Sequence, residues 1–236
     1  MSLDGAERRR VYLFRHGAVN YVDANGQVVA DPDAVSLNER GRAEADAMHT
    51  MFADVAVDKA VCSGLKRTTE TAARVLAGHS LDIEVNTRLE EIRPATERQA
   101  DFDLLRDVAY SHWQAAEPGR RFLGGEAYAD FYARAASAFE GIVSGYDWHA
   151  IAVFAHGGTN AAILGWVMGL GLGAFGVVDQ ATCCLNIIDL DVAKGDRSIL
   201  RKVVRGMNIT VSDPLKSSRH AGDMELLAGY LMKFTA

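Results

Sequence analysis

Cysteine and proline are scarce in this chain of 236 residues, which holds three cysteines and four prolines. Cys183 and Cys184 are adjacent, and together with Cys62 they match neither a disulfide framework nor the ligand spacing of a zinc site. No segment is dominated by proline or by repeats, which excludes fibrous and disordered classes. We therefore expect a globular protein of a reducing compartment, the cytoplasm. No metal or cofactor is expected.

Basic residues are also fewer than acidic ones, 25 compared with 31, which gives a net charge of −6. Such a chain lacks the continuous basic surface that binds nucleic acid or anionic lipid, so any anion must be held locally. One uncharged run, 161–178, approaches the length of a membrane span. Because glycines interrupt it, we expect instead a buried helix that ends near Gly169, followed by a glycine-rich loop.

Short apolar runs rich in β-branched residues alternate with helical patterns, which is typical of a parallel sheet covered by helices on both faces. The candidate strands are 10–15, 58–62, 82–85 and 151–155, with an antiparallel pair at the edge, 184–191 and 198–206. The candidate helices are 36–52, 63–78 and 126–144. The sequence therefore predicts an α/β fold, a three-layer α/β/α sandwich with a mostly parallel central sheet, in a single domain over 1–236.

The first two helices carry local start and stop signals. Either Ser36 or Asn38 could cap the first helix, and Glu39 could close a capping box on Ser36. Ser63 stands where the second helix needs its cap, and Gly78 stands where that helix should stop.

The segment 93–125 interrupts this alternation, and we expect it to form one or two helices over the carboxyl ends of the strands. Ligands of open α/β sheets bind at that edge, so the segment is predicted to be a lid insert. Charged residues on such helices are usually just solvated, but some could contact a second anionic group or a ring of a substrate. The candidates are Arg93, Arg98, Arg106, Arg120, Arg121, Tyr110, Trp113 and Phe122.

Two of the predicted strands run into a histidine followed by glycine, as VYLFRHG at 11–17 and IAVFAHGG at 151–158. Backbone N–H groups and the positive end of a following helix favour an anion at such a place. Arg15 adds a planar fork that suits phosphate or carboxylate. Either histidine alone could equally be a packing residue with an ordinary hydrogen bond, but the pair favours a nucleophile aimed at a bound anion.

Five motifs follow one another along the chain: LFRHG (13–17), CSGLKRTTETA (62–72), RLEEI (88–92), GGE (124–126) and FAHGG (154–158). In this order they resemble the histidine phosphatase superfamily, the phosphoglycerate mutase-like proteins, over about Val11 to Ile188. Arg-His-Gly alone is a weak motif, whereas the ordered set is specific.

The resemblance implies a role for each matching residue. His16 would be the nucleophile, forming a phosphohistidine that water then hydrolyses. Arg15 and Arg67 would bind the phosphate oxygens, and His156 would add a third donor. The implied substrate-binding set is Arg15, Gly17, Arg67, His156 and Gly157. We expect the two histidines to titrate apart, because one must be unprotonated on its attacking nitrogen and the other serves best as a donor.

A glutamate completes the implied catalytic set. Glu91 would protonate the leaving oxygen and later help to deprotonate water, for which it must hold a proton at neutral pH. Its neighbour Glu90 competes for this role, although the family pattern favours the residue just before Ile92. Glu126 is as readily a carboxylate favoured at a helix N-terminus as a site residue.

The main alternative to a phosphomonoesterase is phosphoglycerate mutase-type phosphoryl transfer. The sequence after the glutamate, EEIRPATERQADF (90–102), differs from the stretch that keeps the intermediate from water in the cofactor-dependent mutases, so hydrolysis is favoured. A metallohydrolase with His16, His156 and Glu91 as ligands is disfavoured by the adjacent Arg15. A phospho-ligand-binding protein without turnover has little support, because every core residue is present.

The expected partner is a small-molecule phosphomonoester substrate, with neither nucleic acid nor a membrane. Apolar residues near the C-terminus could cover the core or join two chains into a homodimer. They are Leu226, Leu227, Tyr230, Leu231 and Met232.

Overall fold

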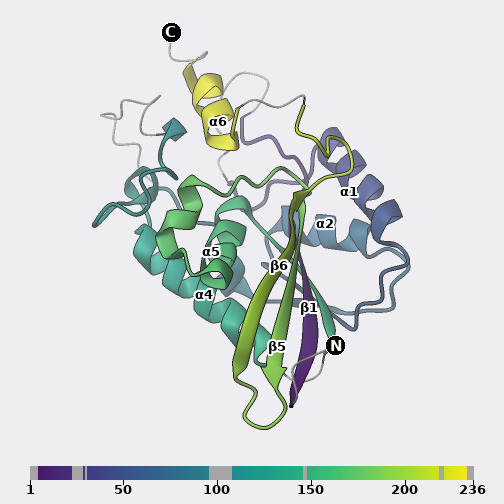
Figure 1. The fold of residues 1–236 in the computed structure, drawn as a ribbon. Helices are drawn as coiled ribbons and strands as arrows, with labels where there is room; N and C mark the ends of the chain where they lie inside the picture. Colours follow the sequence, from purple (N-terminus) through teal and green to yellow (C-terminus); the bar gives the residue numbers. More distant parts are fainter. Residues whose placement is uncertain are drawn as a thin grey trace.

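A six-stranded sheet forms the centre of the computed structural model, which describes residues 5–22, 29, 31–95, 108–145, 148–217 and 221–232 (Figure 1). Its strands, in the order β3-β2-β4-β1-β5-β6, are Ile83–Val85, Lys59–Cys62, Ala150–Ala155, Ala6–Arg15, Leu185–Ala193 and Ile199–Ile209. The first four are parallel, and β5 and β6 are antiparallel to their neighbours. The predicted mostly parallel sheet with an antiparallel pair at one edge is confirmed.

Alternation along β1 separates two cores. Val11 and Leu13 pack on one face of the sheet against α4 (Tyr128–Val143) and α5 (Gly157–Met168). Phe14 packs on the other face, where buried side chains of α1 (Glu39–Phe52) and α2 (Lys66–Val75) meet it. Successive side chains of a strand point to opposite faces, so one strand serves both layers. The predicted α/β/α sandwich is confirmed.

The glycine-rich run after β4 folds as expected. Helix α5 ends at Met168, where Gly169 adopts a left-handed conformation, and the short helix η3 (Gly171–Gly176) follows. In the part of the chain that the structure describes, no helix has both the length and the apolar character that a membrane crossing requires. Near the C-terminus, α6 (Asp223–Met232) buries Ala228 and leaves Leu226 exposed.

One of the two alternative caps of the first helix is confirmed, whereas the predicted start of the second helix is wrong. Asn38, not Ser36, caps α1 by accepting a hydrogen bond from the Gly41 N–H. Helix α2 begins only at Lys66, because Gly64 with a φ of +93° turns the backbone first. The hydroxyl of Ser63 therefore does not cap the helix and is available for another partner.

The predicted lid insert is only partly within the described residues. Arg98 and Arg106 lie outside them, in 96–107. From 110 to 120 the chain runs through turns rather than a helix, and η2 (Phe122–Gly124) follows. Phe122 is buried against the aromatic side of α4, whereas the Tyr110 and Trp113 side chains are exposed. A further short helix, η1 (Thr87–Leu89), lies between β3 and the segment that carries Glu91.

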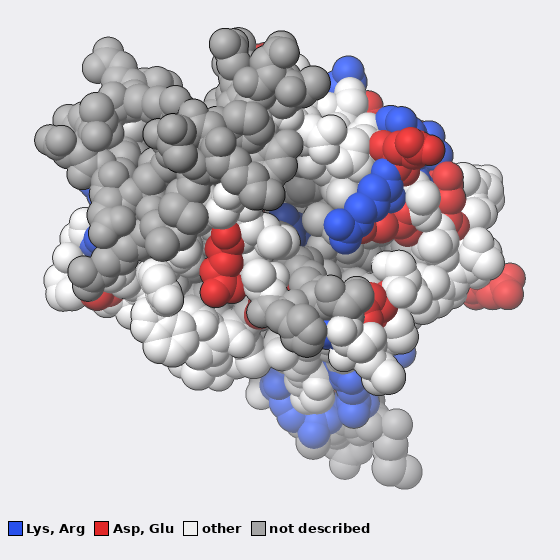
Figure 2. Space-filling model, turned by 90° about the horizontal axis from the view of Figure 1, so that it is seen from above, with Lys and Arg blue, Asp and Glu red and all other residues white. Residues whose placement is uncertain are grey.

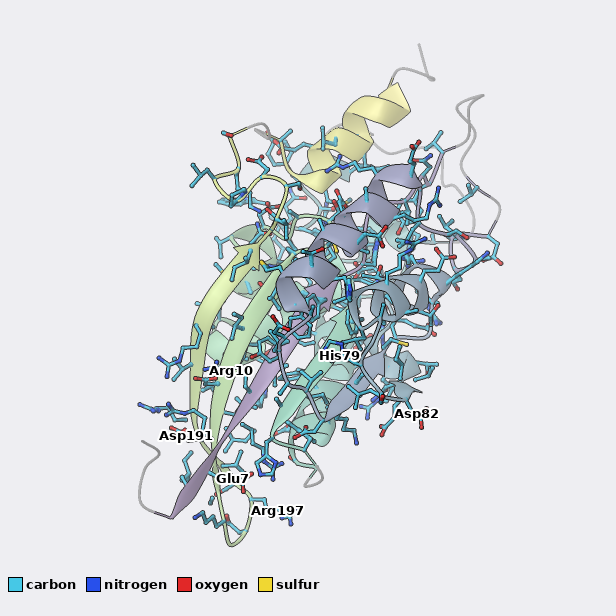
Figure 3. All side chains as sticks on the ribbon, turned by 90° about the vertical axis from the view of Figure 1, so that its right-hand side faces the viewer. Glu7, Arg10, His79, Asp82, Asp191 and Arg197 are labelled. Atoms are coloured by element: carbon cyan, nitrogen blue, oxygen red, sulfur yellow. The ribbon has the colours of Figure 1, made fainter. Side chains whose placement is uncertain are left out.

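The amino end of β1 carries ion pairs that run across the sheet. Asp189 on β5 accepts hydrogen bonds from Arg10 on β1 and Arg205 on β6, at 2.7 Å each. Burial opposes ionisation, but the two guanidinium groups lower the pKa of Asp189 overall. Asp191 is paired in the same way, and Figure 3 shows Asp191 and Arg10 on this part of the sheet. These charges stabilise the end of the sheet that is farthest from the two histidines.

Candidate active site

His16 and His156 follow directly on two neighbouring parallel strands, β1 and β4. The register pairs Arg15 with Ala155, and the His16 N–H donates to the Ala155 carbonyl. The two imidazole rings lie 5.2 Å apart, centre to centre. Figure 2 looks down on this edge of the sheet, where a basic side chain is visible in a hollow near the centre of the view. The structure thus brings the two predicted histidines together.

The orientation of the His16 ring identifies which nitrogen can attack. Nδ1 lies 2.8 Å from the Gly17 carbonyl oxygen. Because a carbonyl only accepts, Nδ1 must carry the proton, and Nε2 keeps its lone pair. Burial, with Arg15 and Arg67 close by, lowers the pKa of His16 well below its ordinary value. The ring is therefore neutral at physiological pH and can act as a nucleophile through Nε2.

The chain after His16 is held tightly against two helices. The Gly17 N–H donates to Thr71 Oγ1 on α2 at 3.1 Å, and the Ala18 N–H donates to Glu44 Oε2 on α1 at 3.0 Å. A Cβ on Gly17 would lie 2.6 Å from the Gly41 carbonyl oxygen. Glycine after the histidine is thus required for the close approach of α1, in addition to any contact with an anion.

The two predicted phosphate-binding arginines come from different elements. Arg15, at the end of β1, donates through Nη1 to the Gln180 carbonyl, and its guanidinium lies against the start of α5 at Gly157. Arg67, on the first turn of α2, is 3% exposed and donates to the Pro32 carbonyl at 2.8 Å. Both cations act on the His16 ring, so the pocket has a positive potential within a protein of net negative charge.

His156 is fully buried just before the first turn of α5. Its Nε2 lies 2.8 Å from Ser63 Oγ, and its Nδ1 has no hydrogen-bond partner among the described residues. Burial, followed by the charge of Arg67, lowers the pKa of His156 well below its ordinary value. We expected the two histidines to titrate apart, but both pKa values move down, because both rings are buried beside the same arginines.

Glu91 and Glu90, which the sequence could not fully separate, have different surroundings. Glu91 Oε2 accepts a hydrogen bond from the Gly158 N–H at 2.9 Å, and Oε1 accepts one from the Ile92 N–H at 3.0 Å. The Glu91 carboxylate therefore lies at the N-terminus of α5, where it contacts Gly158, the second residue after His156. Glu90 instead forms an ion pair with Arg93, so this arginine of the predicted lid binds a carboxylate of the protein itself.

Arg134 is a residue of the site that the sequence analysis missed. It forms an ion pair with Glu126 at 3.0 Å and donates to the Glu90 carbonyl, also at 3.0 Å. Glu126 thus holds Arg134, and Arg134 holds the segment that carries Glu91. The signal was present in the sequence, because Arg134 interrupts the apolar face of its helix between Phe131 and Ala135.

The described residues include neither a reactive thiol nor a cluster of metal ligands. Cys62, Cys183 and Cys184 are free thiols, all buried, and burial raises the pKa of each. Such thiols are unreactive. Across the described ranges, no three His, Cys, Asp or Glu side chains form a group that could hold a metal ion.

Comparison with known proteins links this arrangement to one family. The family model described as histidine phosphatase superfamily (branch 1) matches residues 11–201. The chain is 25% identical to the 2-carboxy-D-arabinitol-1-phosphatase of Triticum aestivum, over 92% of this chain and 44% of that protein. It therefore spans less than half the length of that relative. It is also 26% identical to the adenosylcobalamin/alpha-ribazole phosphatase of Escherichia coli (strain K12), over 77% of this chain and 90% of that protein.

Solved structures share the fold. A mycobacterial glucosyl-3-phosphoglycerate phosphatase superposes with a TM-score of 0.68 at 22% identity, covering 86% of this chain and 99% of that one. The alpha-ribazole phosphatase from Shigella flexneri superposes with a TM-score of 0.65 at 21% identity, covering 84% and 96%. At these identities the likeness concerns the arrangement of the sheet and its helices.

Proposed function

The chain belongs to the histidine phosphatase superfamily, and we propose that it is a metal-independent phosphomonoesterase that works through a phosphohistidine on His16. The observation that carries the proposal is the hydrogen bond between His16 Nδ1 and the Gly17 carbonyl. It leaves Nε2 unprotonated in a ring that is buried beside Arg15 and Arg67. A neutral nucleophile next to two fixed cations suits attack on a phosphoryl group.

In the first step, the phosphoryl oxygens bind Arg15, Arg67 and His156, with the backbone of Gly17 and Gly157 at the rim. Nε2 of His16 attacks phosphorus, the N–P bond forms, and the bond to the ester oxygen breaks. That oxygen leaves as an alcohol with the proton of Glu91. The charge that spreads over the transferring group is stabilised by guanidinium groups that are already in place.

In the second step, water attacks the phosphohistidine. Glu91, now ionised, takes a proton from the water, the N–P bond breaks, and inorganic phosphate leaves. Two backbone N–H groups, of Gly158 on the first turn of α5 and of Ile92, hold the Glu91 carboxylate in position for both steps. Neither step requires a metal ion or an organic cofactor.

The proposed substrate is a phosphomonoester of a small metabolite, because the relatives of this chain are named for such compounds. We propose that 93–125 acts as the lid that selects it, within a single domain over 1–236. The proposed setting is the cytoplasm, where the three free thiols would remain reduced. A homodimer that uses the exposed Leu226 remains a prediction.

The test is phosphate release from a panel of phosphomonoesters, measured with a chelator for wild type and His16→Ala. We expect release by wild type and none above background by the variant. Acid quenching during turnover should trap an acid-labile phosphoenzyme in wild type only. Full turnover by His16→Ala would refute the proposal, and loss of activity with chelator would indicate a metallohydrolase.

The panel should include 3-phosphoglycerate with and without its bisphosphate cofactor. Interconversion of phosphoglycerates without phosphate release would make the protein a mutase. Binding of phosphate esters without either reaction would make it a phospho-ligand-binding protein.

A further inference from the structure

A chain of hydrogen bonds runs from His156 through two hydroxyl groups to a backbone carbonyl. His156 Nε2 lies 2.8 Å from Ser63 Oγ, which lies 2.9 Å from Thr68 Oγ1. Thr68 Oγ1 in turn lies 2.7 Å from the Leu65 carbonyl oxygen. The side chains of Ser63, Thr68 and His156 are all fully buried. Each polar group in this row of hydrogen bonds must therefore find its partners inside the protein.

The Leu65 carbonyl determines the direction of the chain, because it can only accept. Thr68 gives its single hydroxyl proton to Leu65, so Thr68 Oγ1 accepts from Ser63, and Ser63 Oγ accepts from His156 Nε2. The Leu65 N–H also donates to Ser63 Oγ, at 3.4 Å, as this direction allows. In the reverse direction, Thr68 Oγ1 and the Leu65 oxygen would face each other at 2.7 Å without a proton between them.

A proton on Nε2 leaves Nδ1 of the neutral His156 ring with a lone pair and no proton to donate. Nδ1 is buried and has no hydrogen-bond partner in the described part of the chain. The charged and titratable groups around the ring are Arg15, His16, Arg67, Arg134 and Glu91. A phosphoryl oxygen bound among these groups would meet a nitrogen that can accept a proton.

We propose that Ser63 and Thr68 are positioning residues that make His156 a proton acceptor toward the bound phosphoryl group. The inference rests on the proposed function, in which His156 contacts that group. The site then binds a phosphate ester together with one proton, which lies between Nδ1 and a phosphoryl oxygen. This proton either arrives with a singly protonated ester or is taken up from solvent when a dianion binds. The bound state holds one proton in both cases. The site thereby prefers the monoanion, and a dianion binds only with uptake of a proton.

Sulfate is the appropriate probe, because it is a tetrahedral dianion that does not titrate near neutral pH. If one proton must be taken up at His156, each pH unit above neutrality lowers the sulfate affinity of wild type by about tenfold for that proton. Protonation of His16 can add to the slope of log affinity against pH, but it does so equally in every variant. The difference between variants therefore isolates His156.

Thr68→Val is the decisive variant, because valine has nearly the same shape as threonine but no hydroxyl. Ser63 then loses its acceptor and is free to donate to His156 Nε2, which moves the ring proton to Nδ1. We expect the slope of log sulfate affinity against pH to become shallower by about one, so that wild type loses about tenfold more affinity per pH unit than the variant. Thr68→Ser keeps the hydroxyl and should keep the wild-type slope.

A second measurement needs neither a bound ligand nor turnover. In wild type labelled with 15N-histidine, we expect the His156 signals of the tautomer protonated at Nε2, and in Thr68→Val those of the tautomer protonated at Nδ1. An Nδ1-protonated His156 in wild type would overturn the proposal, as would equal sulfate slopes in wild type and Thr68→Val.

The outcomes also separate this inference from the proposed function. If no ester is hydrolysed but sulfate binds with the expected difference in slope, the hydrogen-bond chain stands and the phosphatase fails. If esters are hydrolysed through His16 while the slopes are equal, the phosphatase stands and the hydrogen-bond chain fails.

Discussion

Replacing Gly158 by alanine would put a methyl group where the Glu91 carboxylate lies. The new Cβ would be 2.5 Å from Glu91 Oε1 and 3.4 Å from the ring of Phe131. Phe131 is fixed in the core, whereas the carboxylate is the end of a flexible side chain. We therefore expect Glu91 to swing away and to lose the hydrogen bond from the Gly158 N–H.

The expected loss is larger for catalysis than for stability. A hydrogen bond to a charged group contributes about 1.5–3 kcal/mol, and alanine in a helix recovers up to about 1 kcal/mol relative to glycine. The free energy of unfolding should therefore fall by no more than about 3 kcal/mol, which leaves a protein of ordinary stability folded. Loss of a positioned acid–base group lowers the rate by about 10²–10⁴-fold, and we expect kcat/KM of Gly158→Ala to fall within this range.

The assay compares kcat/KM for an alkyl phosphate among wild type, Gly158→Ala, Glu91→Ala and the double variant. Once Glu91 is alanine there is no carboxylate to displace, so Gly158→Ala should then have little effect. An aryl phosphate, whose leaving group needs less protonation, should show a smaller loss. Gly141→Ala on α4, where a Cβ meets nothing within 4 Å, is the matched control and should keep full activity. Wild-type activity of Gly158→Ala, or an equal loss in both backgrounds, would refute the reasoning.

Two further predictions concern stability, and both can be measured by urea unfolding. In Gly41→Ala the new Cβ would overlap the carbonyl oxygen of Ala18 and lie 2.6 Å from the Ala18 nitrogen. We therefore expect the free energy of unfolding to fall by about 1–3 kcal/mol, whereas in Gly141→Ala it should rise by up to about 1 kcal/mol. Equal urea midpoints for the two variants would contradict this. Burial lowers the pKa of His112 to about 4 and lowers those of the two site histidines as well. The unfolded chain therefore binds more protons below about pH 6.5, and stability present above that pH is lost as the pH falls, by at most about 3 kcal/mol for His112 alone between pH 6.5 and 4. His112→Gln should flatten this loss, and an unchanged pH profile would contradict the assignment.

Local patterns identified the residues that this fold brings to one edge of the sheet. His16 and His156 each follow an apolar run and precede a glycine. The two runs are neighbouring parallel strands, whose carboxyl ends necessarily lie at the same edge of the sheet. The choice between Glu90 and Glu91 was harder, because adjacent residues share almost the same sequence context. Only the packing of their segment on α5 turns one carboxylate toward Gly158 and the other toward Arg93.

Other residues acquire their roles through contacts that no local pattern contains. Ser63 was expected to cap a helix, since serine before a helical run commonly does so. Its hydroxyl instead contacts His156, 93 positions away, because β2 and β4 are neighbours in the sheet. The direction of the His156 pKa shift has the same origin, since it depends on burial beside Arg67. The burial of a residue and the charges around it depend on elements that are far apart in the sequence.

The sequence by itself determined the alternation of strands and helices and the two-sided sheet, and it pointed to the two histidines and two arginines that the fold brings together. Strand and helix periodicity and the ordered motifs are local properties of the chain. Only the tertiary structure decided which nitrogen of each histidine carries the proton, which glutamate lies at the start of α5, and which residues hold these groups in place. Those properties depend on hydrogen-bond partners and burial, which exist only once distant segments have packed together.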